Sequence, residues 1–442
     1  MRKSKRKALL GVLIIVVLVL CIGLFTKNRT NTLNTTSINK ESTSKELDDN
    51  LIGAYIQEED DYTPTSDIPI SGYEFNAEKS YCKIGDVVQE DMTLSYDMET
   101  QTLTVSPIAK EGTKCYLYFD EKLSAGDTIL AHYQTVLTRT SFSSTVTKTT
   151  TGTIYKSANE SQYDDFGEVY YFAGKPTDNW FYFGGYYWRI VRINGDGSIR
   201  LIYNGTSTAQ TGNSTMINTS QAFNSSYNNN MYVGYMYQSG QVHGLTTNSS
   251  IKTTLDNWYL SNLADEAEYL DGNAGFCGDR YPSTSSSNSN GSGGTGTTTT
   301  YYGAYIRLVN SKNPSFKCTD KDNDLYTTPG SSEGNGALKV TPGDNDSTPT
   351  PIGLITADEV AFAGGVYGSS NSSYYLYNNA VYWTMSPFWY GNGSAYVFFV
   401  YSDGTLGATY VNNSWGVRPV INLKSAIAIT GSGTTSDPFK IQ

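Results

Sequence analysis

Hydrophobic and polar positions divide this chain into segments of different texture, and the first segment is the most hydrophobic. An unbroken apolar run extends from Ala8 to Phe25, directly after a cluster of five basic residues: Arg2, Lys3, Lys5, Arg6 and Lys7. In a helix that rises about 1.5 Å per residue, this run is just long enough to span a bilayer core of about 30 Å. No small-x-small cleavage pattern follows the run. We therefore predict a cytoplasmic basic flank and a signal-anchor transmembrane helix over residues 1–26, with the rest of the chain outside the cell.

The next segments are predicted from a change of periodicity. Residues 27–51 contain almost nothing that could form a core, and we interpret them as a flexible stalk. From residue 52 to residue 124, stretches such as "KCYLYFDE" alternate apolar and polar positions, which is the period of a β-strand. This alternation predicts a small β-sandwich-like module over residues 52–124. Residues 125–151 begin with a short predicted helix and continue as a Thr/Ser-rich linker.

Residues 152–442 are predicted to form one larger domain. In "YYWRIVRINGDGSIRLIYNG", two alternating runs flank the glycine-rich turn Asn194–Gly197, which predicts a hairpin covered on both faces. Apolar residues at helical spacing predict a helix in "SSIKTTLDNWYLSNLADEAEYLDG" that ends near Gly272. A capping box, Thr356 with Glu359, predicts a second helix.

The C-terminal third of the chain returns to strand patterns, as in "AVYWTMSP" and "SAYVFFVYSDGTLGATYVNN". Pro387 is expected to end or bend the first of these strands. Two low-complexity insertions, 281–300 and 329–350, are expected to be surface loops without a core of their own. The whole pattern predicts an α+β domain of antiparallel strands with two helices.

Composition and charge narrow the class of protein. Aromatic residues make up 13% of the 442 residues and charged residues only 17%, which suits an exported surface protein. The net charge is -11, and residues 1–30 carry +7, so the remainder carries -11 - 7 = -18. An acidic ectodomain disfavours nucleic acid and anionic lipid as partners and is compatible with calcium or with neutral glycans.

Outside the predicted membrane segment there are four cysteines: Cys82, Cys115, Cys277 and Cys318. An even number in an exported chain predicts two disulfides, for which sequence alone allows three connectivities. Pairing in order keeps each bridge local, Cys82 with Cys115 and Cys277 with Cys318. No C-x-x-C spacing occurs and the chain has only two histidines, so a Cys/His zinc site is not expected.

The sequence offers no catalytic constellation but one weak metal candidate. No G-x-S-x-G elbow, H-E-x-x-H motif or Walker loop is present. Asp320, Asp322 and Asp324 stand at alternate positions, which resembles the first half of a calcium loop. The glycine and the closing glutamate of an EF-hand are missing, so only a looser surface calcium site, or simply a solvated acidic loop, is considered.

Aromatic residues near the C-terminus are the main candidates for ligand binding. We expect Trp383, Val397 and Phe399 to be core, whereas Trp389 and Tyr390 fall in a predicted Gly/Asn-rich loop. Candidate ligand-binding residues are therefore Trp389, Tyr390, Asn392, Tyr401 and Trp415. Arg418 lies in an apolar run, and we expect it to form a structural tie to carboxylate or carbonyl groups.

Four phrases carry a family resemblance: "YYWRIVRINGDGSIRLIY", "ITADEVAFAGG", "YWTMSP" and "GVRPVINL". In these phrases the chain, from about residue 165 to 442, resembles uncharacterised surface proteins of Gram-positive gut bacteria. More remotely, the plan is similar to the C-type-lectin-like fold, which formylglycine-generating enzymes share. The resemblance implies a rigid scaffold that presents a face for recognition. It implies no catalytic residue, because the enzyme branch needs a late cysteine pair and no cysteine follows Cys318.

Three functional hypotheses follow. The first is a single-pass cell-membrane protein that binds an extracellular protein or glycan through aromatic loops, without enzymatic activity. The second is an extracellular enzyme acting on glycans or cell-wall material, which requires two carboxylates facing one cleft. The third is a structural component of the cell envelope.

Overall fold

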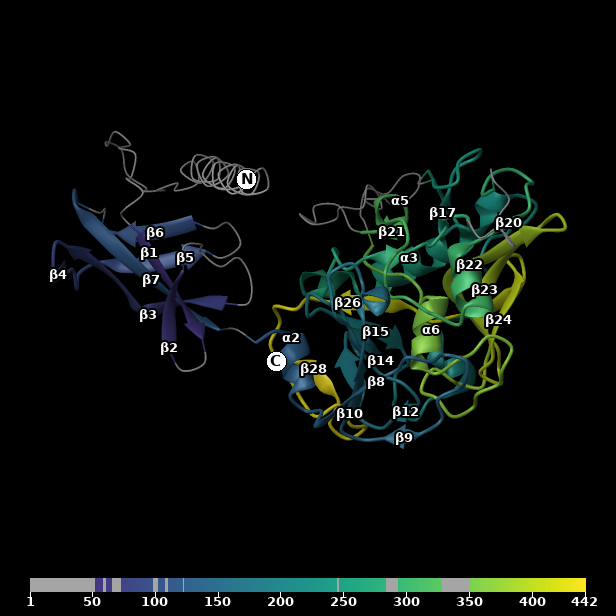
Figure 1. Cartoon of the computed structure of the whole chain (residues 1–442), viewed down its shortest axis with the longest axis horizontal. Helices are drawn as coiled ribbons and strands as arrows, with labels where there is room; N and C mark the ends of the chain where they lie inside the picture. Colours follow the sequence, from purple (N-terminus) through teal and green to yellow (C-terminus); the bar gives the residue numbers. More distant parts are fainter. Residues whose placement is uncertain are drawn as a thin grey trace, which may run out of the picture. The chain divides into compact units, whose positions relative to one another are not determined.

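The computed structural model describes residues 52–58, 61–65, 73–97, 102–107, 110–121, 123–244, 246–283, 293–327 and 350–442. These residues form two compact units, the first ending at Leu123 and the second running from Ser124 to Gln442. The described part of the chain is mostly β (Figure 1). No helix within it combines the length and hydrophobicity needed to cross a membrane. The predicted transmembrane helix and stalk lie outside the described residues.

The first unit is a five-stranded mixed sheet with a hairpin packed on one face. The sheet has the order β2 (Asp61–Thr65), β1 (Ile52–Glu58), β7 (Thr113–Glu121), β3 (Tyr73–Ile84) and β4 (Val87–Val88), and the hairpin is β5 (Thr93–Asp97) with β6 (Thr102–Ser106). Leu94 and Leu103 of the hairpin pack with Leu117 and Phe119 of the sheet. The predicted Cys82–Cys115 disulfide is confirmed and joins two directly opposite residues of β3 and β7.

The second unit contains a nine-stranded sheet that brings together the two ends of its chain. Its strands are β8 (Thr135–Thr138), β10 (Thr153–Lys156), β11 (Tyr170–Tyr171), β13 (Trp180–Phe183), β14 (Tyr186–Ile193), β15 (Ile199–Tyr203), β26 (Val420–Leu423), β27 (Ile429–Thr430) and β28 (Phe439–Ile441). The predicted hairpin is confirmed as β14 and β15, and residues from Trp188 to Ile193 are buried on both faces.

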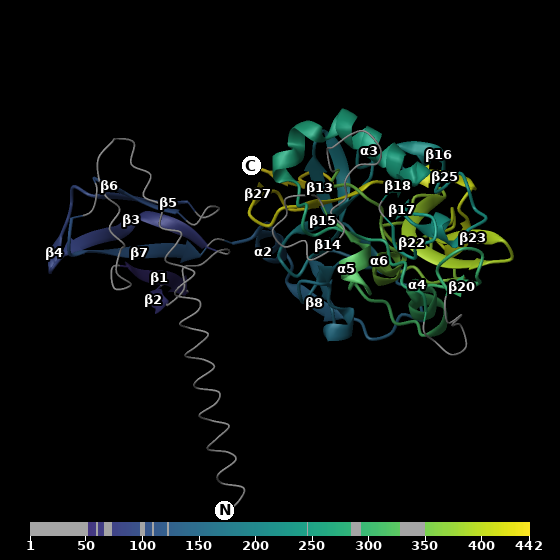
Figure 2. The ribbon, with the colours of Figure 1, turned by 90° about the horizontal axis from the view of Figure 1, so that it is seen from above.

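A second, six-stranded sheet lies on the far side of the unit from α2 (Ala125–Leu130) in both ribbon views (Figures 1 and 2). It contains β16 (Asn218–Ala222), β20 (Thr300–Tyr301), β22 (Tyr382–Gly391), β23 (Ser394–Val400), β24 (Leu406–Tyr410) and β25 (Ser414–Val417). Three two-stranded pairs complete the strands: β9 (Thr149–Thr150) with β12 (Lys175–Pro176), β17 (Met236–Tyr237) with β18 (Thr247–Asn248), and β19 (Phe276–Cys277) with β21 (Leu325–Tyr326).

Helices are short and connect these sheets. The α-helices besides α2 are α3 (Ser250–Asn262), α4 (Gly303–Tyr305), α5 (Lys321–Asp324) and α6 (Ala357–Ala363). The 3-10 turns are η1 (Glu160–Gln162), η2 (Gly212–Thr215), η3 (Asn230–Val233) and η4 (Ala264–Tyr269), and η5 (Ile306–Asn310) is a π turn. The capping box of α6 is confirmed, with Thr356 and Glu359 bonding reciprocally.

Several predictions about these elements were wrong. Residues 125–151 are not a linker, because α2 buries Ala125 and Ile129 in the core of the second unit and β8 pairs with β10. The α3 helix ends at Asn262 rather than near Gly272, since the side chain of Asn262 bonds back to the carbonyl of Trp258 and the chain then tightens into η4.

Strand pairing and the insertions also differ from expectation. The sheets are not purely antiparallel: β1 with β7, β8 with β10, β9 with β12, β13 with β28 and β22 with β25 pair in parallel. The end of the insertion at 281–300 belongs to a sheet, because Thr300 lies in β20 and is buried. Nearly all of the insertion at 329–350 lies outside the described residues.

Buried charges tie α6 to the nine-stranded sheet. Oε1 of Glu359 lies 2.5 Å from Nε of Arg200 on β15 and 3.1 Å from Nε of Arg192 on β14. These contacts are ion pairs by distance and lack hydrogen-bond geometry. Burial lowers the pKa of Arg200 to about 10, and Glu359 opposes the shift. All three side chains are buried, so each charge depends on its partners for compensation.

A separate buried arginine confirms a prediction. Arg418 donates to the carbonyl of Tyr203 from Nε at 3.2 Å and from Nη2 at 3.0 Å, and to the carbonyl of Leu376 at 3.1 Å. Its side chain is fully buried, and its partners come from distant parts of the chain. Arg418 is therefore a structural tie through backbone carbonyls.

The first prediction concerns the carboxylate of Glu359. Glu359→Gln keeps the capping hydrogen bonds, because glutamine also serves in a capping box. It removes the counter-charge of Arg200, whereas Arg192 keeps its ion pair with Asp164 at 3.3 Å. Unpairing a buried charge costs about 3–5 kcal/mol, so we expect the free energy of unfolding to fall by this order. Urea unfolding followed by tryptophan fluorescence measures it, since all six tryptophans lie in the second unit.

The matched control for this experiment is Glu268→Gln, which removes the same charge at an exposed position of η4. This variant should change the free energy of unfolding by less than about 0.5 kcal/mol. Equal losses in the two variants would contradict a special role for Glu359.

Candidate functional site

The strand β22 passes through Pro387 instead of ending there. Its pairing register with β23 shifts between Trp383 and Pro387 and again between Pro387 and Trp389. Such shifts are β-bulges, which accommodate a proline without ending the strand. The prediction that Trp389 and Tyr390 lie in a loop is therefore wrong, because both belong to the strand.

A two-residue turn joins β22 to β23. Asn392 and Gly393 have positive φ angles of 53° and 75°, and Gly391 pairs with Ser394 across the turn. Two consecutive residues with positive φ angles form the type I′ turn, for which Asn-Gly is the preferred sequence. Asn392 is exposed at the tip and serves the turn.

Four aromatic side chains form a continuous row across four neighbouring strands. Tyr301 of β20 lies opposite Trp389 of β22, Trp389 opposite Tyr396 of β23, and Tyr396 opposite Tyr410 of β24. We call these four residues the aromatic ladder. Directly opposite residues on one sheet face are the closest cross-strand neighbours, so the register itself brings the rings together.

Ring geometry confirms contact along the aromatic ladder. The centroids are 5.5 Å apart from Tyr301 to Trp389, 5.4 Å from Trp389 to Tyr396, and 4.5 Å from Tyr396 to Tyr410. Each pair is tilted by 31° to 37°. The first three rings are half-buried and Tyr410 is 44% exposed. The aromatic ladder thus presents ring surface to solvent from a paired sheet.

The opposite face of the same strands is core. Tyr390, Ala395 and Val397 are buried, and the hydroxyl of Tyr390 donates to the carbonyl of Asn228 at 3.0 Å. Alternation along each strand therefore places Tyr390 and Val397 on the face opposite the ladder. Tyr390, a sequence-predicted ligand residue, belongs to the core.

Glycine at position 391 makes room for Trp389. A Cβ atom added there would lie 2.3 Å from Cζ3 of the Trp389 ring, so the indole lies directly against the glycine. Gly391 has no positive φ, and its role is therefore space rather than backbone freedom. The indole ring thus covers a glycine two positions further along its own strand.

A second row of rings adjoins the aromatic ladder, but two of its members, Phe388 and Phe398, are buried in the core. Phe388 lies 5.0 Å from Tyr305 and 5.6 Å from Tyr367, and it contacts Phe398 on the β23 strand. Phe398 and Tyr396 are two positions apart and share one face, so the adjacent residues Phe388 and Trp389 both face that side. The register shift next to Trp389 permits this arrangement.

Tyr401 and Trp415, the other predicted ligand residues, lie apart from the aromatic ladder. Both rings contact Phe399, at 4.2 Å and 6.2 Å respectively. Phe399 is opposite in parity to Tyr396, so these rings belong to the other side of the sheet. Tyr401 is 44% exposed, whereas Trp415 is half-buried and its Nε1 has no hydrogen-bond partner among the described residues.

The hydroxyl group of Tyr396 is uncharged near neutral pH. Burial and then hydrogen bonding to Tyr410 raise the pKa of Tyr396 to about 12. No charged side chain takes part in the ladder itself, which consists of three tyrosines and a tryptophan. Its chemistry therefore suits a neutral partner with flat apolar faces and hydroxyl groups.

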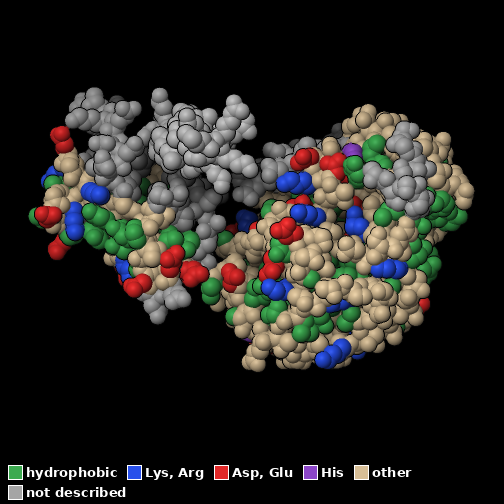
Figure 3. All heavy atoms as spheres, in the orientation of Figure 1, with side chains coloured by type: hydrophobic (Ala, Val, Ile, Leu, Met, Phe, Trp, Pro, Cys, Tyr) green, Lys and Arg blue, Asp and Glu red, His purple; other side chains and the backbone are tan. Residues whose placement is uncertain are grey.

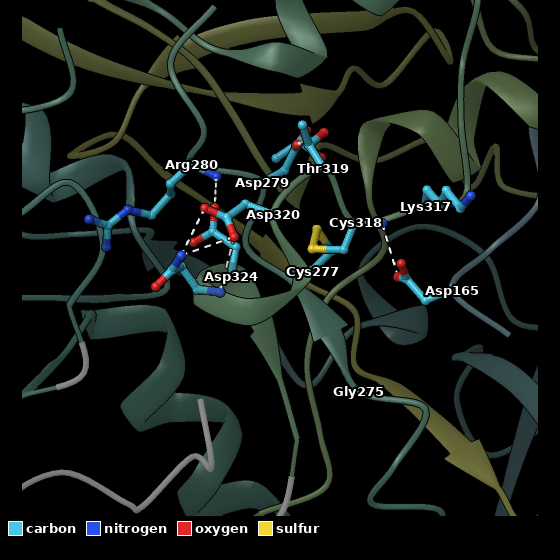
Figure 4. Close-up of a disulfide and its surroundings, with 12 residues drawn as sticks. Asp165, Gly275, Cys277, Asp279, Arg280, Lys317, Cys318, Thr319, Asp320 and Asp324 are labelled. Atoms are coloured by element: carbon cyan, nitrogen blue, oxygen red, sulfur yellow. Dashed lines mark hydrogen bonds between the residues drawn. A yellow bond between two sulfur atoms is a disulfide. The ribbon is translucent and has the colours of Figure 1, made fainter. Parts of the chain in front are cut away.

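The three aspartates of the calcium hypothesis have separate roles, and Figure 4 shows two of them, Asp320 and Asp324. Asp320 caps α5, Asp322 is exposed, and Asp324 is buried and accepts from the backbone N–H of Arg280. His243 lies between two of them, 3.0 Å from Asp324 and 3.6 Å from Asp320. Within the described ranges, no three acidic, His or Cys side chains are placed to hold one metal ion.

The Cys277–Cys318 disulfide, also predicted, is confirmed beside these aspartates (Figure 4). Asp320 and Asp324 lie on one side of it, and Asp165 on the other side accepts from the backbone N–H of Cys318 at 3.0 Å. Two cavities in the second unit, one lined by Tyr235 and Thr327 and the other by Phe142 and Tyr367, each have a volume of about 10 Å³. Each has room for about one water molecule.

Sequence reasoning therefore found one of the four ladder residues, Trp389, and missed three. Tyr396 and Tyr410 carried a usable signal, because the two turns fix their partners by counting outward from each turn. Tyr301 carried no such signal, because its strand β20 pairs with β22 from a distant part of the sequence. Comparison with protein-family models, with curated proteins and with solved structures finds no match to this chain.

The second prediction tests the packing of Trp389 on Gly391. Gly391→Ala places a methyl group where the indole ring lies, so the ring must move. We expect a loss of about 1–3 kcal/mol in the free energy of unfolding, the usual cost of overpacking. Iodide quenching should also rise, because a displaced Trp389 is more exposed. 

A double-mutant cycle provides the control. In a Trp389→Ala background the methyl group meets no indole, so Gly391→Ala should then cost almost nothing. The same loss in both backgrounds would show that the glycine serves the backbone instead.

Proposed function

We propose that this chain is a membrane-anchored, outward-facing binding protein whose aromatic ladder recognises a neutral glycan. The supporting observation is the row of four partly exposed rings, held in register across β20, β22, β23 and β24. Sugar rings present flat C–H faces that stack on aromatic rings, while their hydroxyl groups bond to tyrosine hydroxyls. A row of rings at spacings of 4.5 to 5.5 Å offers such a surface.

The proposal includes a finer assignment of both units. The first is a β-sandwich-like module, which is supported by a core enclosed between the sheet and the β5–β6 hairpin. The second is a C-type-lectin-like domain, which is supported by a chain that returns at β26 and β28 to the sheet in which it began. The apolar run from Ala8 to Phe25 is the proposed membrane anchor, with both units outside the cell.

The third prediction compares two equally exposed tyrosines. Tyr410→Ala removes a ring from the ladder, and Tyr401→Ala removes one from the other side of the sheet; each ring is 44% exposed. A stacked ring contributes about 1.4 kcal/mol, so Tyr410→Ala should weaken glycan binding about tenfold and Tyr401→Ala should leave it unchanged. A glycan array identifies the ligand, and calorimetry then measures the dissociation constant of the full chain.

Two outcomes would count against this proposal. Equal weakening by both substitutions would place the ligand elsewhere. Absence of any glycan ligand, together with loss of folding in Trp389→Ala, would mean that the ladder is a purely structural element. Thermal unfolding of each variant separates these cases.

A further inference from the structure

The sheet of the first unit has a second face that is not part of its core. Along β7, Cys115, Leu117 and Phe119 are buried, whereas the side chains between them are exposed or half-buried. The buried set packs against the β5–β6 hairpin. The alternate set therefore points to the opposite side of the sheet.

Tyrosine rings cover the centre of this outer face. Tyr118 stacks on Tyr55 with centroids 4.8 Å apart, and Tyr116 stacks on Tyr81 at 5.0 Å. Tyr62 meets the edge of Tyr118 at 5.1 Å. We call these five residues the tyrosine face; all five are half-buried and come from β1, β2, β3 and β7.

A glycine keeps the tyrosine face flat. Gly53 lies directly opposite Tyr116 in the parallel pairing of β1 with β7. A Cβ atom there would lie 3.3 Å from Cδ1 of Tyr116 and 3.6 Å from the ring of Tyr55, so both rings lie over the glycine. Rings that lie along a sheet leave a smooth surface suited to packing against another sheet.

The two ends of the tyrosine face carry like charges in pairs. At one end Lys83 of β3 lies directly opposite Lys114 of β7, and at the other end Glu74 lies directly opposite Asp120. Along β7 the outward row is therefore Lys114, Tyr116, Tyr118 and Asp120, about 20 Å from the first to the last. Directly opposite like charges destabilise a sheet when nothing compensates them.

Contacts within the unit hold Lys83, Lys114 and Asp120 on this face. The two ammonium groups lie over tyrosine rings, Lys83 5.3 Å from the Tyr81 centroid and Lys114 5.6 Å from the Tyr116 centroid. Asp120 accepts a hydrogen bond from Asn76 at 2.8 Å and another from Tyr62. Lys79 of β3 also reaches the acidic end, where its ammonium group lies 4.1 Å from the Tyr62 centroid and donates to the Tyr62 hydroxyl at 2.9 Å. Along β7 itself the order of side chains is positive, aromatic, aromatic, negative.

This sequence of charges is complementary to itself when reversed. A two-fold axis that lies in the plane of the interface, perpendicular to β7, would place two such faces against each other and bring the lysine end of one copy onto the acidic end of the other. The stacked tyrosines of both copies would meet between these ends. Two-fold interfaces are isologous and require this kind of self-complementary surface, and tyrosine is enriched in interface cores.

We propose that the tyrosine face is a homodimer interface, which a second copy of this chain occupies face to face in antiparallel orientation. On the visible surface of the first unit, Figure 3 shows hydrophobic side chains gathered together with Lys or Arg side chains beside them. Dimerisation through this unit would present two copies of the second unit together. The proposal is independent of what the aromatic ladder binds.

The fourth prediction uses charge reversal on the full chain in mild detergent. Lys83→Glu/Lys114→Glu makes both ends of the face acidic, and Glu74→Lys/Asp120→Lys makes both ends basic. Sedimentation velocity should show a dimer for the natural chain and at least tenfold weaker dimerisation for each variant alone. An equimolar mixture of the two variants should regain the dimer, because acidic ends then meet basic ends.

The control, Lys148→Glu/Lys175→Glu, makes the same change of charge at two exposed positions of the second unit and should leave the dimer intact. Circular dichroism checks that every variant is folded. The proposal is overturned if the natural chain is a monomer at about 100 μM, if each folded variant dimerises as the natural chain does, or if the mixture stays monomeric. Weaker dimerisation in the control would point to net charge rather than to the face.

Discussion

The second unit depends on one carboxylate shared between two buried guanidinium groups. Glu359 holds helix α6 against β14 and β15 through Arg192 and Arg200. The same helix reaches the other sheet, since the backbone N–H of Ala357 donates to the hydroxyl of Ser386 on β22 at 2.9 Å. In both ribbon views α6 lies between the two sheets (Figures 1 and 2). The position of the strand that carries Trp389 is therefore linked to an ion pair in the nine-stranded sheet.

The β22–β24 strands separate two tasks by alternation. Side chains of one parity, such as Tyr390 and Val397, fill the core, whereas the other parity includes the half-buried ladder residues Trp389 and Tyr396 as well as the buried Phe398. The same division occurs in the first unit, where Leu117 is core and Tyr116 lies outside. Each unit thus has an aromatic sheet face in addition to its core. The two faces differ in chemistry, because the ladder is uncharged and the tyrosine face ends in paired charges.

Local signals in the sequence predicted much of this, and long-range contacts account for most of the errors. Asn392-Gly393 demands a two-residue turn, and counting outward from it places Trp389 opposite Tyr396. The Gly/Asn composition suggested a loop instead, and the expectation that Pro387 would end or bend the strand supported this interpretation. Proline interrupts the regular hydrogen bonding between paired strands, but a β-bulge can accommodate it. No local sequence pattern predicts the bulge.

Other features could not be read from short-range patterns at all. Residues 125–151 are rich in Thr and Ser, yet they pack against elements hundreds of residues away; Nη1 of Arg139, for example, donates to the carbonyl of Phe362 at 2.8 Å. Tyr301 joins the ladder through a two-residue strand that only its pairing with β22 defines. The lysine pair of the first unit became visible only once the register of β3 and β7 was known. The disulfides were the exception, because proximity along the chain favoured the pairing that the structure contains.

Placement of the aromatic ladder on paired strands, rather than on a loop, has a thermodynamic consequence. A ligand that binds a loop must first pay for ordering it, whereas these backbones are already fixed and the rings already restrict one another. Little conformational entropy is then lost on binding, and weak stacking contacts can add up to a useful affinity. The same rigidity limits adaptation: under the proposed function, a fixed row of rings favours ligands whose flat faces repeat at its own spacing and disfavours those that require it to rearrange.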